Sequence, residues 1–381
     1  MKCHTVKCYQ ILYLLLFILP LGGCVSAPSS VLNPEWVKQE EDREKKLKEL
    51  RDAAAPKMAQ LREAVKRGDA ESQYQLACEY LRSVNVEGHG SWTLYPDSEA
   101  EGYKWLRKAA EQGHAEAQYE LWWKLCGCRW IDSESDAATL KNRTEGIKWL
   151  YKAAEQGHAR AQRGLGSFYL DGTHGMPAEP TEAEKAEAVK WFRKAAEQGV
   201  GMTALGMCYR DGNGVPEDKA EALRWYRKAA DKGEENAMYL VGWCYFEGHG
   251  VPQDKEEAVR WYRKAAELGD FGGMLDLGKC YYDGEGVPQD TAEAIKWYLK
   301  AEENGGAFFV RKELIRCYIR GEYDPGEETV NDWLYGLRRW VEHDDEPKKT
   351  TKVSDYMQKE AEEYAELLRE MERIRKSEPQ S

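Results

Sequence analysis

The chain has 381 residues, of which 42% are hydrophobic and 11% aromatic, and its formal net charge is −12. Nucleic acid is disfavoured as a partner, because phosphate binding needs a basic face and none is evident in this acidic sequence. The acidic balance is otherwise uninformative about the fold.

The chain begins with an apolar segment behind a positive start. Two lysines precede the apolar run 11–19, which is short for a membrane span, and Leu21, Gly22, Gly23 and Cys24 follow. This arrangement resembles a bacterial lipoprotein signal. The resemblance implies that residues 1–23 are a signal peptide, and that Cys24 is lipidated and becomes the new amino terminus. An uncleaved membrane anchor and an ordinary signal peptide are the alternatives.

Lipidation of Cys24 would determine where the protein acts. Two or three acyl chains, of the palmitate type, hold a protein stably on a membrane, whereas a single chain is marginal. Val25 follows the cysteine, where Asp would favour retention in the inner membrane. The sequence therefore predicts a lipid-anchored protein of the bacterial cell envelope, at the outer membrane and facing the periplasm.

A linker and a charged segment precede the regular part of the chain. Residues 24–34 comprise the lipidated cysteine and a short polar linker, 26–34, that would reach about 15 to 20 Å as a flexible coil. Residues 35–68 are highly charged and are predicted to be helical. We expect them to cap the following array, because the open end of a stacked structure must be covered.

Tryptophan recurs at near-constant spacing along two-thirds of the chain, and the last three intervals are all 36 residues. This period indicates helix–turn–helix units that bury their apolar faces only by stacking on one another. We call these residues the repeat tryptophans and expect them in the core. They are Trp105, Trp149, Trp191, Trp225, Trp261, Trp297 and Trp333.

Three units, at 200–233, 234–269 and 270–305, follow one pattern closely. In each, a first helix contains a Leu-Gly or Val-Gly pair and then Cys-Tyr, and a loop with two glycines and a proline ends it. An Asp three residues before a Glu, such as Asp254 before Glu257, has the spacing of a helix N-cap. The second helix carries Trp-Tyr and is expected to end at Gly233, Gly269 or Gly305.

Four units fit less strictly. Those at 69–113, 114–157 and 158–199 have longer loops, and the unit at 306–341 lacks the alanine pair. The pattern over 69–341 resembles the Sel1-like repeat family, which is related to tetratricopeptide arrays. The resemblance implies an all-α fold, an α/α superhelical solenoid of about seven helix–turn–helix repeats. It also implies an adaptor that holds partners, although some bacterial members have been described as β-lactamase-like.

The relation to tetratricopeptide arrays implies that three positions of each first helix line a groove. They lie two residues before the Leu, directly after the Gly and directly after the Tyr. Aromatic residues with Arg favour partner binding at such positions, although large aromatics on a solenoid helix also pack within the array. The candidate partner-binding residues are Tyr74, Tyr119, Trp123, Met207, Arg210, Tyr239, Trp243, Phe246, Leu275 and Tyr282.

Four cysteines, Cys208, Cys244, Cys280 and Cys317, precede the repeat tyrosines. Successive first helices lie about 8 to 10 Å apart, beyond the reach of about 7 Å between Cα atoms that a disulfide needs. We expect buried thiols. Some bacterial Sel1-like proteins carry a Cys pair in each repeat, and this chain departs from that pattern.

The remaining cysteines of the array are Cys78, Cys126 and Cys128. The sequence is equally compatible with a disulfide between two of these cysteines and with free thiols. A metal site is less favoured, because no histidine partner is evident. His114 and His158 begin first helices, where capping or hydrogen bonds between repeats are favoured over metal binding.

The carboxy-terminal segment 346–377 carries apolar residues at alternating spacings of four and three, which predicts a helix. They are Met357, Ala361, Tyr364, Leu368 and Met371. This helix is expected to cap the last repeat, and pairing with another chain is the alternative.

Motifs of several enzyme classes are missing from the sequence. It has no Ser three residues before a Lys in the penicillin-binding arrangement, no phosphate loop and no paired zinc-helix histidines. We expect no enzyme activity, no cofactor and no metal. The sequence favours a membrane-tethered scaffold that binds a protein or peptide in cell-envelope assembly or maintenance. The alternative is an envelope hydrolase or binding protein acting on peptidoglycan or β-lactam-like substrates.

Overall fold

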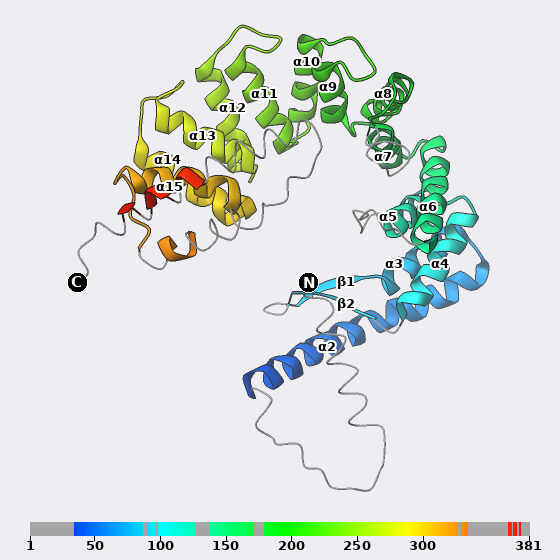
Figure 1. Cartoon of the computed structure of the whole chain (residues 1–381). Coiled ribbons are helices and arrows are strands. Elements are labelled where there is room, and N and C mark those ends of the chain that lie inside the picture. Colours follow the sequence, from blue (N-terminus) through cyan, green and yellow to red (C-terminus); the bar gives the residue numbers. More distant parts are fainter. Residues whose placement is uncertain are drawn as a thin grey trace. The chain divides into compact units, whose positions relative to one another are not determined.

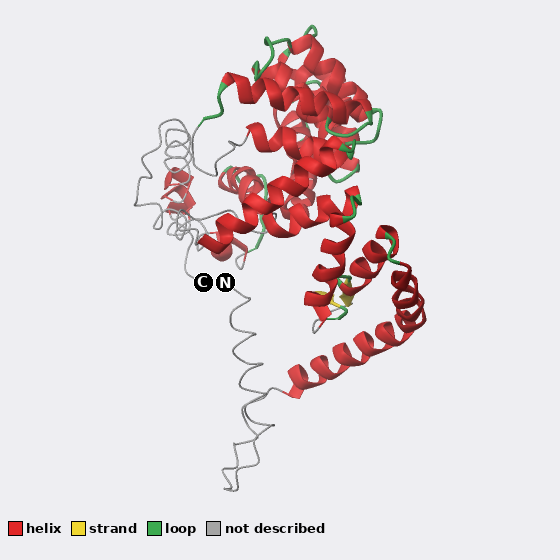
Figure 2. Ribbon diagram, turned by 90° about the vertical axis from the view of Figure 1, so that its right-hand side faces the viewer, coloured by secondary structure: helices red, strands yellow, loops and turns green. Residues whose placement is uncertain are grey.

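The computed structural model describes residues 34–86, 90–95, 98–126, 137–170, 179–326, 329–333, 365–367, 369–371 and 373–374. The predicted signal and Cys24 lie outside this part of the chain. The described chain is mainly helical, and two strands form one small sheet (Figures 1 and 2). It divides into two compact units, residues 1–109 and 110–381.

The first unit combines a long helix, a hairpin and the first repeat. Its elements are α2 (Pro34–Ala64), η1 (Val65–Arg67), α3 (Ala70–Tyr80), β1 (Ser83–Val86), β2 (Gly90–Thr93) and the start of α4 (Glu99–Glu111). The antiparallel strands pair Ser83 with Thr93. The sequence analysis expected only a long loop there, so the hairpin is a finding of the structure.

The long helix α2 packs on the first repeat through one row of side chains. The buried members of this row, at spacings of three, four or seven residues, are Leu47, Ala54, Met58 and Leu61, and Val65 of η1 continues it. On the same face, Arg51 donates a hydrogen bond to the Leu94 carbonyl at 2.8 Å. Lys57 pairs with the buried carboxylate of Glu79, also at 2.8 Å. This charged helix therefore supplies the first repeat with an apolar surface.

The second unit is a run of helix pairs in which each helix packs on the next. Figure 1 shows these pairs following one another along the unit. The elements are α5 (Ala115–Cys126), α6 (Ala137–Glu155), α7 (Ala159–Leu170), α8 (Glu182–Glu197), α9 (Met202–Asp211), α10 (Lys219–Ala230), α11 (Glu235–Glu247), α12 (Lys255–Glu267), α13 (Phe271–Asp283), α14 (Thr291–Ala301), η3 (Glu302–Gly306) and α15 (Ala307–Ile319). The predicted α/α solenoid is confirmed.

The glycine of each Leu-Gly or Val-Gly pair allows the two helices of a repeat to approach closely. A Cβ atom placed on Gly242 in α11 would lie 2.7 Å from the ring of Tyr262 in α12. Tyr226, Tyr262 and Tyr298 occupy this position in the three regular repeats and are almost completely buried. The glycine therefore makes room for the largest core side chain of each repeat.

The repeat tryptophans do not all lie in the core. Four are buried, namely Trp149, Trp191, Trp297 and Trp333, but Trp105, Trp225 and Trp261 are only half-buried. The expectation is wrong for these three. In the regular repeats, the following tyrosine takes the position that faces the glycine. The Trp261 ring has the Lys264 ammonium 4.2 Å from its centroid, and the buried Trp149, Trp191 and Trp297 have a lysine at the same distance.

The expected helix ends are mostly confirmed. Asp254 accepts a hydrogen bond from the backbone N–H of Glu257 at 2.9 Å, and Gly269 ends α12 with a φ of 100°. The expectation for Gly305 is wrong. That glycine lies inside the π-helical turn Glu302–Gly306, which joins α14 directly to α15.

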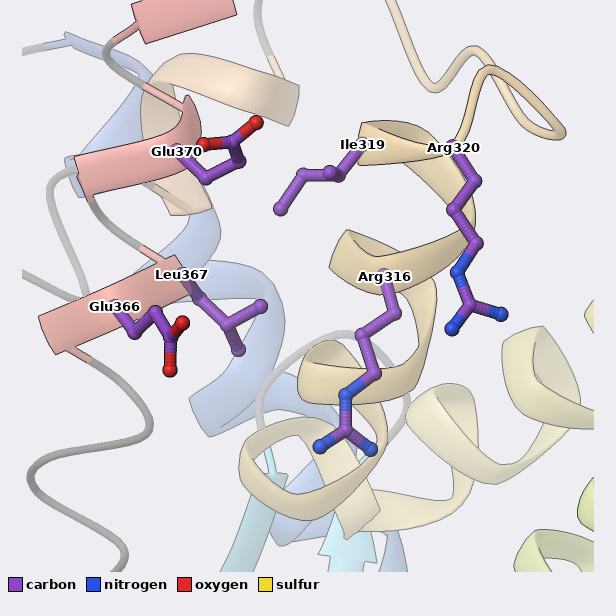
Figure 3. A pocket seen from close by; sticks show the side chains of 6 residues that line it. All are labelled: Arg316, Ile319, Arg320, Glu366, Leu367 and Glu370. Carbon is purple, nitrogen blue, oxygen red and sulfur yellow. The ribbon is translucent and has the colours of Figure 1, made fainter.

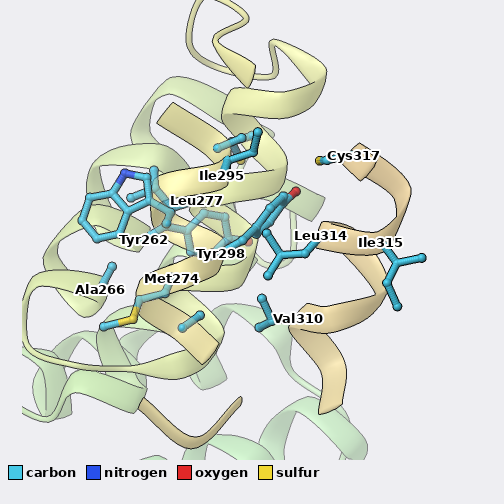
Figure 4. Close-up of a cluster of buried hydrophobic side chains, with 14 of the residues drawn as sticks. Tyr262, Ala266, Met274, Leu277, Ile295, Tyr298, Val310, Leu314, Ile315 and Cys317 are labelled. Atoms are coloured by element: carbon cyan, nitrogen blue, oxygen red, sulfur yellow. The ribbon is translucent and has the colours of Figure 1, made fainter. Parts of the chain in front are cut away.

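The carboxy-terminal end of the chain contributes to the core of the last repeats. Met371 is 1% exposed and belongs to the same cluster as Val310 and Leu314 of α15, and Leu367 packs against it. Figure 4 shows the side of this cluster formed by Leu277, Tyr298 and α15. A segment that caps the last repeat must cover its apolar core, and Met371 and Leu367 make this kind of contact. The other four members of the predicted apolar stripe, Met357, Ala361, Tyr364 and Leu368, lie outside the described residues.

Candidate protein-interaction surface

All ten candidate binding residues lie on first helices of the repeats. Tyr74 is on α3 of the first unit, and the others are on α5, α9, α11 and α13 of the second unit. Trp123 is 48% exposed, and the other nine side chains are half-buried. We call the part on α9, α11 and α13 the first-helix surface. Its residues are Met207, Arg210, Tyr239, Trp243, Phe246, Leu275 and Tyr282.

Two candidates from consecutive repeats contact each other. The guanidinium carbon of Arg210 lies 5.7 Å from the Trp243 ring centroid, and the His249 ring meets the same indole edge-on at 4.4 Å. Both Asp211 carboxylate oxygens accept hydrogen bonds from Arg210, at 2.6 and 2.8 Å. These bonds raise the pKa of Arg210 above its ordinary value. The indole is therefore held beside a permanent cation.

Tyr239 is a partly exposed candidate residue that also packs against neighbouring helices. Its ring stacks on Tyr262 at a centroid distance of 5.8 Å. A Cβ atom on Gly272 would meet it at 3.2 Å, so the backbone of α13 passes close to the ring. Burial raises the pKa of the Tyr239 hydroxyl, and the carboxylate of Asp276 raises it further. Trp243 also packs against the apolar core, but its ring in addition contacts the polar side chains of Arg210 and His249.

The two aromatic candidates that follow repeat tyrosines also meet charged side chains. The Lys255 ammonium lies 5.0 Å from the Phe246 ring centroid. The Tyr282 hydroxyl donates a hydrogen bond to Glu322 at 2.8 Å and accepts one from Arg320. Aromatic side chains with charged neighbours therefore continue from α11 to α13.

The aromatic candidates of the second repeat form a separate cluster. Tyr119 lies 5.4 Å from Trp122 and stacks on His158 at 5.0 Å. The Nδ1 atom of His158 accepts a hydrogen bond from the Ala161 N–H, and its Nε2 atom lies 2.6 Å from Glu116 of the preceding repeat. His114 accepts from the Ala117 N–H in the same way. The expected capping role of both histidines is confirmed.

The four regularly spaced cysteines are buried thiols, as expected. Burial raises the pKa of Cys208, Cys244 and Cys317 to about 11 and that of Cys280 to about 12. These thiols are therefore neutral at physiological pH and poor nucleophiles.

The other cysteines lie apart from this row. Cys126 is half-buried and donates a hydrogen bond to the Arg143 carbonyl at 3.6 Å. Cys78 is exposed, and Cys128 lies outside the described residues. Within the part of the chain that the structure describes, no three His, Cys, Asp or Glu side chains are grouped so that they could hold a metal ion.

The sequence analysis did not anticipate a row of arginine–tyrosine contacts between repeats. Arg193 donates to the hydroxyl of Tyr209 at 2.9 Å, and Arg263 donates to Tyr281 at 2.7 Å. Arg227 donates to Tyr245 in the same way. The signal was present in the sequence, because an Arg follows the aromatic pair of the second helix in each of these repeats.

A small cleft of about 290 Å³ lies at the end of the array and was also not anticipated. One wall belongs to α15 and the other to the helical residues near position 370 (Figure 3). Its lining residues are Arg316, Ile319, Arg320, Glu366, Leu367 and Glu370.

Among the helices that the structure describes, we find none with the length and apolar character needed to cross a membrane.

Comparisons with known proteins agree on one kind of repeat. The Sel1 repeat pattern matches six segments that together cover over half of the chain, at 70–114, 135–158, 159–200, 200–234, 236–270 and 272–306. The matched segments of this pattern end at residue 306, before the predicted seventh unit. No curated protein matches the sequence.

Two solved structures are similar over much of the chain. One is c5321, a protective antigen of uropathogenic Escherichia coli with an SLR fold, which is 27% identical with a TM-score of 0.57. The match covers 81% of this chain but only 64% of that protein, less than two-thirds of its length. The other is a Sel1 repeat protein from Oxalobacter formigenes, 32% identical with a TM-score of 0.53, where the match covers 64% of this chain and 92% of that one.

Proposed function

Because this chain belongs to the Sel1 repeat family, whose members are generally non-catalytic scaffolds for protein–protein interaction, we propose that it binds a protein or peptide on its first-helix surface. The observation that carries this proposal is the aromatic row on consecutive first helices. Trp243, Phe246 and Tyr282 are all partly exposed and contact charged side chains. Aromatic residues in such settings dominate the binding energy of protein interfaces.

The setting we propose for this interaction is the cell envelope. The sequence Leu21-Gly-Gly-Cys24 after an apolar run supports a lipid anchor on Cys24. Sorting to the outer membrane, facing the periplasm, is supported by Val25. A tethered scaffold at that place would act in envelope assembly or maintenance by holding partners near the membrane.

The anchor is tested by Cys24→Ser. We expect this variant to lose incorporation of labelled palmitate and normal processing before residue 24, because serine has no thiol to receive the diacylglyceryl group. Cys8→Ser, which changes another cysteine of the same segment, should keep both. Undiminished palmitate in the Cys24 variant would exclude lipidation at this position.

The binding surface is tested by Trp243→Ala combined with Phe246→Ala. We expect partners crosslinked in solubilised envelopes to be captured at least about tenfold less, because two adjacent aromatic anchors are removed. Quantitative mass spectrometry of the captured proteins measures the loss. Trp261→Ala removes a half-buried indole from α12 instead and should keep the partners. Full capture by the double variant would place the binding surface elsewhere.

A further inference from the structure

A carboxy-terminal segment lies beside α15 at the end of the array (Figure 3). We call it the tail segment, and its described residues are 365–367, 369–371 and 373–374. Met371 is 1% exposed in the cluster that contains Val310 and Leu314 of α15, and Leu367 packs against the same cluster. The tail segment thus contacts this first helix through apolar residues at i and i+4.

The side of α15 that faces the tail segment carries the groove positions of the seventh repeat. When the repeats are aligned on the cysteine that precedes the repeat tyrosine, Arg316 takes the position of Trp243. Ile319 takes the position of Phe246 in the same alignment. Arg316 and Ile319 line the cleft, and Figure 3 shows Ile319 and Leu367 extending into it from opposite walls. The tail segment therefore covers positions that belong to the first-helix surface in the preceding repeats.

Arg320 connects the cleft to the first-helix surface. It lines the cleft, and its guanidinium carbon lies 5.4 Å from the ring centroid of Tyr282. It also donates a hydrogen bond to the Tyr282 hydroxyl. A partner that covered Tyr282 and continued along the array would therefore reach the tail segment next.

The contact between the tail segment and α15 is incomplete. An open cleft of about 290 Å³ remains between their walls, whereas a packed protein interior leaves few voids larger than a water molecule. On the α15 wall, Arg316 donates to Glu313 at 2.9 Å and Arg320 donates to Tyr282. Departure of the tail segment would expose apolar surface but would leave neither arginine without a partner.

We propose that the tail segment is an internal competitor of the partner. It covers the groove positions of the seventh repeat and is displaced when a partner occupies the first-helix surface and continues onto α15. Because the tail segment belongs to the same chain, it competes with a separate molecule at a high effective concentration. A partner that also holds α9, α11 and α13 overcomes this competition, whereas a ligand of α15 alone does not. This inference rests on the proposed function and adds its regulation.

The first test asks whether α15 binds the tail sequence when it is supplied as a separate molecule. The probe is a fluorescent peptide with the sequence of residues 361–376, and the receptor is the full-length chain with Leu367→Ala and Met371→Ala. Anisotropy should show at least about tenfold tighter binding to this variant than to the unsubstituted chain, because its own segment no longer closes the groove. Arg369→Ala with Arg373→Ala changes two exposed positions of the same segment and should bind the peptide as weakly as the unsubstituted chain.

The second test measures the competition with partners. Capture of crosslinked partners from solubilised envelopes should rise at least about threefold in the chain with Leu367→Ala and Met371→Ala, because the partner no longer has to displace the segment. Adding Ile319→Asp to this variant places a charge on the α15 wall. We expect it to remove both the gain in capture and the binding of the peptide.

Three results would overturn the inference. They are equal affinity of the peptide for the substituted and the unsubstituted chain, no binding to either, and binding that survives Ile319→Asp. Trp243→Ala with Phe246→Ala tests the protein-binding proposal separately, because that variant leaves the tail segment unchanged.

Hydrogen exchange on the unsubstituted chain decides the question if circular dichroism shows that the substituted chain does not fold. The amides of Leu367 and Met371 should exchange at least about tenfold faster than the amide of Leu314, because the tail segment opens while α15 stays folded. Equal rates would show that the segment is a permanent part of the core and not a competitor.

Discussion

Tyr262→Ala is expected to lower the free energy of unfolding by about 3 to 5 kcal/mol, the range for truncating a large aromatic residue in a packed core. Tyr262 is 1% exposed, and its ring lies against Gly242 of α11 and Tyr239. Gly242 has no side chain that could fill the space, so the substitution leaves a cavity between the two helices. Denaturant unfolding followed by circular dichroism measures the loss.

Trp261→Ala is the matched control, because it removes an even larger ring from the preceding position of the same helix. Trp261 is half-buried, and its indole N–H donates to Glu257 at 2.9 Å. Less apolar surface returns to water, so a smaller loss of stability is expected. A loss as large as that of the tyrosine variant would contradict the assignment of the core position to Tyr262.

The adjacent positions of Trp261 and Tyr262 illustrate what the sequence could predict. The helices and their ends were predicted because glycine, proline and capping aspartate act locally, through backbone conformation and one hydrogen bond. Which aromatic residue of the pair enters the core depends on which one faces Gly242, a contact between two helices. Two large aromatics next to each other give no local signal of that choice.

The binding surface was predictable only in part, for a related reason. The repeat period placed Tyr239 and Trp243 on one face of α11, as the structure has them. It could not show that Tyr239 stacks on Tyr262, since that depends on distances between repeats. The hairpin of the first repeat and the cleft beside Arg316 lie where the period is broken or ends. The facing residues of the cleft are about 50 positions apart in the sequence, and no spacing rule connects them.

Gly250→Ala is expected to destabilise the array by more than the strain of a left-handed alanine, which is about 1 to 2 kcal/mol. Gly250 has a φ of +74°, and a Cβ atom there would lie 2.3 Å from the carbonyl oxygen of Lys219. That oxygen belongs to the first turn of α10 in the preceding repeat and cannot rotate away. The substitution must therefore move two repeats apart. Gly214 and Gly286 make the same approach to Lys185 and Lys255.

Gly233→Ala separates backbone strain from this clash between repeats. Gly233 has a φ of +87°, but a Cβ atom there would meet nothing within 4 Å, so alanine costs only the strain of its own backbone. Denaturant unfolding should show a clearly larger loss for the Gly250 variant. Hydrogen exchange should show faster opening of the first turn of α10 in that variant alone, because nearest-neighbour contacts stabilise a repeat array. Equal losses of stability in the two variants would mean that the loop around Gly250 shifts to accommodate the added methyl group. The approach of Gly250 to Lys219 would then not set the spacing of the repeats.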